Sequence, residues 1–181
     1  DEVIFSKHAF AVYPLATQAV GAKAIEVPAK QYGHDLEAML AAVTPATRLI
    51  FVANPNNPTG TFLSGSQIDA FIRRVPSHVV VVIDEAYNEF LTPEQQYDAI
   101  AWVREFSNVI VSRSFSKAYG LGGLKAGFAL VSEKLVEQFY QNVVNTIGCD
   151  SNLVEAALID LLTKGKAAME RHKENWIEIR R

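Results

Sequence analysis

The chain has 181 residues, of which 49% are hydrophobic and 20% are charged, and its formal net charge is −3. This composition is typical of a globular protein with a sizeable core, and the acidic balance argues against a nucleic acid or an anionic membrane as partner. One cysteine, Cys149, excludes an internal disulfide, and no stretch is long and apolar enough to span a bilayer, so we expect a cytoplasmic location.

Six short apolar runs predict β-strands, at residues 3–5, 24–27, 49–52, 79–83, 109–111 and 127–131. Several are apolar on both faces, which is typical of strands that are covered on both sides. Helical patterns lie between and after these strands, at residues 12–22, 35–43, 64–74, 98–106, 132–143, 151–162 and 164–181. Asp35 and either Ser64 or Ser66 are suitable N-caps for two of these helices.

This alternation predicts an α/β fold with three layers, α/β/α, around a mixed and mostly parallel sheet. We expect residues 1–150 to form the core of one domain and residues 151–181 to be helices that lead toward another. Both ends look cut, so we expect a fragment of a longer protein. Ligands of parallel sheets bind beyond the carboxyl ends of the strands, which makes the loops after the strands the candidate site.

The third predicted strand is followed by residues 54–60, Asn-Pro-Asn-Asn-Pro-Thr-Gly. Because all these residue types favour turns, a plain turn is one interpretation. Two Asn-Pro steps also make a rigid loop, from which an asparagine amide could donate to a phenolate or carboxylate oxygen. The loop itself leaves both interpretations open.

Asp84 directly follows the apolar residues of the fourth predicted strand. A buried carboxylate is costly unless it is paired, and a cationic ligand would be a suitable partner. A helix N-cap and a local salt bridge are the alternative interpretations.

Residues 112–127, Ser-Arg-Ser-Phe-Ser-Lys-Ala-Tyr-Gly-Leu-Gly-Gly-Leu-Lys-Ala-Gly, follow the fifth predicted strand. Hydroxyls and backbone N–H groups suit a phosphate, and Lys117 among them is either a nucleophilic amine or a solvated charge. The glycine spacing differs from the dinucleotide-binding fingerprint, which disfavours a nucleotide-dependent oxidoreductase.

Taken together and in this order, the three loops resemble those of the fold-type-I aminotransferases of class I/II, which depend on pyridoxal 5'-phosphate (PLP). The shared pattern is Asn-Pro-x-Asn-Pro-Thr-Gly, then a strand with Asp-x-x-Tyr, then Ser-x-Ser-Lys with a basic residue eight positions on. Residues 9–13 and 112–127 are most similar to the histidinol-phosphate aminotransferase branch. The resemblance implies that residues 1–150 are the PLP-binding large-domain core, truncated at its N-terminus, and that a small C-terminal domain follows residue 181.

The resemblance implies catalytic roles for Lys117, Asp84 and Tyr87. Lys117 would bind PLP covalently and later move the α-proton of the substrate. Asp84 would pair with the protonated pyridine nitrogen, which keeps the ring able to accept electrons. Tyr87 and Asn57 would hydrogen-bond the phenolic oxygen of the cofactor.

The remaining cofactor contacts implied by the resemblance concern the phosphate and the ring face. Ser114, Ser116 and Lys125 would hold the phosphate, and Phe10 would stack on the ring. The family usually has arginine where this chain has Lys125; lysine keeps the charge but loses the bidentate fork.

The reaction implied by the resemblance transfers an amino group between a histidinol-phosphate-like donor and 2-oxoglutarate, in a homodimer. As a fragment, the chain itself is expected to be inactive. The alternatives are another PLP enzyme of the same fold, such as threonine-phosphate decarboxylase, and a non-catalytic truncated domain. The four histidines are scattered without metal-ligand spacing, so no metal site is expected.

Overall fold

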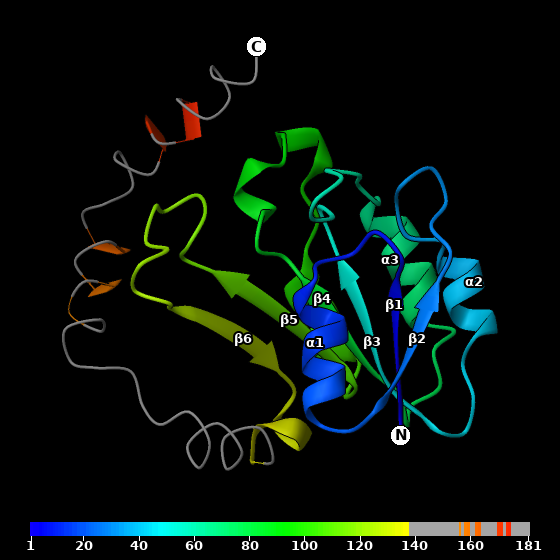
Figure 1. The fold of residues 1–181 in the computed structure, drawn as a ribbon. Helices are drawn as coiled ribbons and strands as arrows, with labels where there is room; N and C mark the ends of the chain where they lie inside the picture. The colour runs from blue at the N-terminus through cyan, green and yellow to red at the C-terminus, as the bar shows by residue number, and fades with distance from the viewer. Residues whose placement is uncertain (138–155, 157, 160–161, 164–169, 172, 175–181) are drawn as a thin grey trace.

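The computed structural model describes residues 1–137, 156, 158–159, 162–163, 170–171 and 173–174 (Figure 1). Its centre is a six-stranded sheet that consists of β1 (Glu2–Ser6), β2 (Lys23–Val27), β3 (Thr47–Ala53), β4 (Val80–Asp84), β5 (Val109–Ser114) and β6 (Gly127–Val131). The strand order is β2-β1-β3-β4-β5-β6, and only the pair of β5 and β6 is antiparallel. The predicted mixed, mostly parallel sheet is confirmed.

Helices cover both faces of this sheet. Helix α1 (Val12–Ala19) lies in front of it in Figure 1 and packs on β1 and β3. Helices α2 (Leu36–Ala41), α3 (Gly65–Ile72) and α4 (Ala99–Glu105) contribute to the core on the opposite face. Two short 3-10 helices, η1 (Asn88–Phe90) and η2 (Pro93–Gln95), follow β4. The α/β/α layering is therefore confirmed.

The alternation of side chains along β1 explains the two cores. Ile4 points into the larger cluster with α2, α3 and α4, whereas Val3 and Phe5 join the smaller cluster beneath α1. Successive side chains of a strand point to opposite faces, so a strand buried on both sides must be apolar at every position. Burial on both faces therefore explains why the strands appear in the sequence as continuous apolar runs.

The helix boundaries agree with the capping signals. The Asp35 side chain accepts a hydrogen bond from the backbone N–H of Ala38, and Ser64 forms a capping box with Gln67. Helix α1 is shorter than the predicted range, because the chain turns at Gly21 with a φ of 69°.

Five of the six strands extend beyond their predicted ranges, and β4 and β5 do so into polar residues. Strand β4 includes Asp84, which pairs with Ala53 of β3 and Ser112 of β5. Strand β5 continues to Ser114 because β6 pairs with it from Ile110 to Ser114. Polar residues thus lie within the ends of strands, where neighbouring strands complete the backbone hydrogen bonds.

The last predicted helices lie largely outside the described residues. Residues 133–137 are helical, as are the described residues within 151–181, and the rest of the ranges 132–143, 151–162 and 164–181 lies outside. None of the helices in the described part of the chain has the length and hydrophobicity that crossing a membrane requires.

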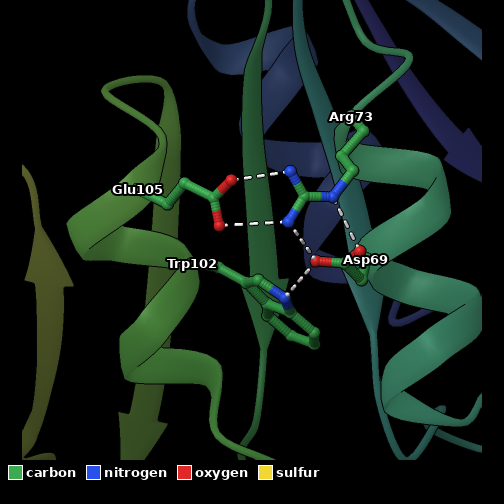
Figure 2. Close-up of polar contacts among 4 residues, drawn as sticks. All are labelled: Asp69, Arg73, Trp102 and Glu105. Atoms are coloured by element: carbon green, nitrogen blue, oxygen red, sulfur yellow. Dashed lines mark hydrogen bonds and ion pairs between the residues drawn. The ribbon is translucent and has the colours of Figure 1, made fainter.

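A polar cluster on the surface joins α3 to α4 (Figure 2). The guanidinium of Arg73 forms two hydrogen bonds with Glu105, of 2.6 and 3.0 Å, and two with Asp69, of 2.8 and 3.2 Å. Asp69 also accepts a hydrogen bond of 3.1 Å from the indole N–H of Trp102, and Arg73 lies over the ring of Phe106. The bidentate geometry makes this cluster stronger than an isolated surface ion pair.

We expect Arg73→Ala to lower the thermal unfolding midpoint by about 2–4 °C at neutral pH, because two carboxylates and a ring lose their shared cation. The hydrogen bond from Arg73 lowers the pKa of Asp69 in the folded chain. This contribution to stability is therefore complete above the ordinary aspartate pKa of about 3.9 and is lost as the pH falls through the lower folded value.

Calorimetry from pH 7 to pH 2.5 would check this prediction. The difference between Arg73→Ala and the unmodified chain should shrink as the medium becomes acidic. Arg104→Ala is the matched control, because Arg104 is an exposed arginine of α4 next to Glu105 and takes no part in the cluster. This variant should leave the unfolding midpoint nearly unchanged. An equal loss for both variants would contradict the role of the cluster.

Candidate active site

A cavity of about 390 Å³ opens at the carboxyl ends of β3, β4 and β5. Its size lies within the range of about 300–1,000 Å³ that is usual for small-molecule sites. All eight site residues that were predicted from the sequence line it: Phe10, Asn57, Asp84, Tyr87, Ser114, Ser116, Lys117 and Lys125. They come together because the carboxyl ends of adjacent parallel strands meet at one edge of the sheet.

The loop after β3 is held by asparagine side chains that do not line the cavity. The Asn54 amide donates to the carbonyl of Leu63 and to the hydroxyl of Tyr97, and its oxygen accepts from the N–H of Leu63, at 2.8–3.0 Å. Asn56 donates to the carbonyl of His8 at 2.8 Å. These bonds fix the loop on both sides, so that Asn57 faces the cavity from a rigid turn.

Asp84 presents its carboxylate to the cavity from the end of β4. One oxygen, Oδ1, accepts a hydrogen bond from the backbone N–H of Ala86 at 3.1 Å. The other, Oδ2, accepts from the hydroxyl of Tyr13 at 2.6 Å, although Tyr13 lies far away in the sequence. Asp84 is therefore not a helix N-cap, which was one of the interpretations that the sequence left open.

The next residue, Glu85, points away from the cavity and is fully buried. Its Oε2 accepts a hydrogen bond of 2.9 Å from Nε of Arg113 on β5 and forms an ion pair with Nη2 of the same guanidinium, also at 2.9 Å. Burial raises the pKa of the Glu85 carboxyl, and the guanidinium of Arg113 opposes that rise. This ion pair ties the residue that follows β4 to the end of β5.

The loop after β5 carries the hydroxyls and the amine. The Ser114 hydroxyl accepts a hydrogen bond from the N–H of Ser116 at 3.0 Å. Lys117 is exposed, and its Nζ lies 5.6 Å from the centre of the Tyr87 ring. Lys125 has a φ of 56°, in the left-handed region that costs a side-chain-bearing residue about 1–2 kcal/mol. The loop thus turns back so that both amines line one cavity.

Phe10 forms an aromatic wall of the cavity and is 39% exposed. Its ring meets the ring of Tyr13 edge to face, with centroids 5.9 Å apart. Tyr13 in turn stacks on Phe51 of β3 at 4.3 Å and 4°. The wall is therefore supported by two further aromatic rings.

These groups suit PLP in their chemistry. A carboxylate can pair with a ring nitrogen, an amide and a phenol can donate to a phenolic oxygen, and a primary amine can bond to an aldehyde. Serine hydroxyls and a lysine can hold a phosphate. Among the described residues, no three His, Cys, Asp or Glu side chains are grouped as a metal ion would require.

Sequence reasoning missed two contacts at this site. Tyr13 lies three residues after Phe10, so helical spacing could have indicated that both rings share one face. Glu85 directly follows Asp84, the last residue of β4, so the alternation of side chains along the strand could have placed it on the opposite face. No pattern in the sequence indicated that Arg113 is the partner of Glu85.

Comparison with known proteins places this arrangement in context. A sequence profile described as "Aminotransferase class I and II" matches residues 1–181. "Histidinol-phosphate aminotransferase 2" of Ralstonia nicotianae is 66% identical over 133 residues, which cover 74% of this chain and 36% of that protein. "Histidinol-phosphate aminotransferase 1" of Idiomarina loihiensis is 56% identical over 137 residues, or 76% of this chain and 37% of that protein. The matched residues span little more than a third of the length of these relatives.

Solved structures agree with these matches. Histidinol-phosphate aminotransferase from Sinorhizobium meliloti, in complex with pyridoxal-5'-phosphate, superposes with a TM-score of 0.84 and 29% identity. The superposition covers 95% of this chain and 46% of that one. An aromatic aminotransferase from Pyrococcus horikoshii gives a TM-score of 0.86 at 23% identity, over 98% of this chain and 50% of that one, which shows a shared fold.

Proposed function

The chain belongs to the class I and II aminotransferase family, and from this premise we propose that it is the cofactor-binding core of a PLP-dependent histidinol-phosphate aminotransferase. The observation that carries the proposal is the cavity in which Asp84, Tyr87, Asn57 and Lys117 meet. The similarity to proteins of that name supports the choice of branch. Residues 1–150 would then be the large-domain core, and 151–181 would lead toward a small domain.

Two residues act on protons in this proposal. Bound PLP supplies an electron sink for the carbon next to the amine of the donor. Asp84 holds the proton of the pyridine nitrogen, since its carboxylate lines the cavity and is oriented by two donors. The Nζ of Lys117, which lines the same cavity, would hold the cofactor and would accept the α-proton of the donor.

The other residues bind and orient the cofactor. Asn57 and Tyr87 donate to its phenolic oxygen from the loops after β3 and β4. Phe10 covers one face of the ring and keeps water from it. The phosphate is bound by Ser114, Ser116 and Lys125, where a lysine provides the charge without the two parallel hydrogen bonds of an arginine.

The substrates and the assembly are part of the same proposal. The amino donor is histidinol phosphate and the acceptor is 2-oxoglutarate, and the full-length protein works as a homodimer in the cytoplasm. The 181-residue chain alone is expected to be inactive, because it spans only part of the length of its relatives. Turnover in an amino-transfer enzyme alternates between two half-reactions, so ping-pong kinetics should be found.

Assaying the full-length protein with L-histidinol phosphate and 2-oxoglutarate tests the proposal, and formation of glutamate is the expected result. The 181-residue chain under the same conditions is expected to give none. O-phospho-L-threonine is the comparison substrate, and its release of carbon dioxide without glutamate would identify a decarboxylase instead. If the full-length protein binds PLP but forms neither glutamate nor carbon dioxide, the remaining interpretation is a non-catalytic domain.

A further inference from the structure

The contact between Tyr13 and Asp84 is the shortest hydrogen bond at the cavity. The phenol oxygen lies 2.6 Å from Oδ2 of the carboxylate. This distance is typical of a hydroxyl that donates to a charged acceptor. Tyr13 is only 4% exposed, so water does not compete for this bond.

The ring of Tyr13 is held in place independently of this bond. It stacks on Phe51 and meets Phe10 edge to face. It also packs with Val3 and Phe5 of β1 in the cluster beneath α1. The hydroxyl is thus aimed at Asp84 by a ring that cannot turn away.

Burial and the neighbouring Asp84 charge raise the pKa of Tyr13 above its ordinary value, so the phenol keeps its proton and stays a donor. Together with the N–H of Ala86, it gives each oxygen of Asp84 one donor. An ionised carboxylate has about four acceptor positions, so both oxygens can still accept from a ring nitrogen.

We propose that Tyr13 is a positioning residue whose hydroxyl holds Asp84 as the ionised partner of the cofactor ring nitrogen. The inference rests on the proposed PLP function. Hydrogen bonds to a carboxylate favour its charged form. A carboxylate that loses its donor competes more strongly for the proton of the pyridinium, and the ring becomes a weaker electron sink.

Other charged groups surround the carboxylate and must stay constant in a test. Glu85 interacts with Asp84 electrostatically from behind the cavity. The remaining titratable side chains that line the cavity are Tyr87, Arg113, Lys117 and Lys125. None of them is altered by a substitution at position 13.

The test is a pH titration of the visible absorption band of full-length holoenzyme, in which PLP is attached to Lys117. The group that titrates is the nitrogen that joins Lys117 to the cofactor. A positive charge on the ring nitrogen repels the proton on this group, so losing that charge raises the midpoint of the titration. We expect Tyr13→Phe to raise this midpoint by about one pH unit and to weaken PLP binding roughly tenfold. Phenylalanine keeps the stack on Phe51, and thermal unfolding verifies the fold.

Thr47→Val is the matched control, because Thr47 is a fully buried residue at the amino end of β3 whose hydroxyl accepts from the N–H of Thr44. It should leave the titration midpoint unchanged. A second variant carries 3-fluorotyrosine at position 13, which keeps the ring and makes the hydroxyl a stronger donor. Its midpoint should move in the opposite direction to that of Tyr13→Phe.

Unchanged midpoints in both position-13 variants would overturn the inference while leaving the proposed function intact. A midpoint that moves equally in Thr47→Val would also overturn it, since the loss of any buried hydroxyl would then have the same effect. Failure of unmodified holoenzyme to attach PLP at Lys117 would instead overturn the proposed function.

Discussion

Lys117→Ala is expected to abolish the covalent attachment of PLP. Lys117 is an exposed amine that lines the cavity together with Asp84 and Tyr87. Borohydride would fix the cofactor irreversibly on the unmodified chain, and mass spectrometry would find the added mass on the peptide that contains Lys117. In the variant, we expect neither this label nor the visible absorption band of the bound cofactor.

Two controls sharpen this result. Lys117→Arg keeps the positive charge but has no primary amine, so it should also remain unlabelled. Lys7→Ala removes a surface lysine on the loop after β1 and should keep full labelling. Label spread over several surface lysines of the unmodified chain, in both the 181-residue and the full-length protein, would contradict the assignment.

Asp84→Asn is the substitution with the next largest expected effect. Asparagine has the shape of aspartate but only one acceptor oxygen, so it can accept from Tyr13 or from Ala86 and not from both. It also lacks the charge that would hold a proton on the ring nitrogen. Removing one preorganised electrostatic contact of this kind costs on the order of 10²- to 10³-fold in rate. We expect a fall of that size in glutamate formation by the full-length protein.

Asp35→Asn is the matched control for this variant. Asp35 caps α2, and asparagine caps a helix as well as aspartate does. Its rate of glutamate formation should equal that of the unmodified protein. A rate for Asp84→Asn within twofold of normal would show that the carboxylate does not act on the ring nitrogen.

The fold could be predicted from the sequence because its signals are local. Apolar runs without alternation indicated strands covered on both faces, and the structure places helices on both sides of the sheet. Asp35 and Ser64 marked helix starts that the structure confirms. The strand ends were less accurate, since the pairing of β5 with β6 extends β5 to Ser114 and no local pattern encodes such pairing.

One rule of parallel sheets, that the loops after neighbouring strands meet, predicted where the cavity lies, and the resemblance to the aminotransferase family implied which residues line it. The rule brings the loops of Asn57, Asp84 and Lys117 together without any knowledge of strand order. It could not supply the bond between Tyr13 and Asp84, which depends on how α1 lies across the sheet. Nor could it supply the partner of Glu85, because burial of an ion pair is decided by packing from several elements.

The parallel pairing of β3, β4 and β5 also bears on how the chain folds. Each of the three loops of the cavity is separated from the next by a complete crossover, so all the contacts between them are distant in the sequence. Such contacts form only after the entropy of loop closure has been lost, which slows folding. The cavity is therefore complete only when the sheet is, and a cofactor that binds it shifts the equilibrium toward the folded chain by mass action. PLP would serve this protein as a folding ligand as well as a reagent.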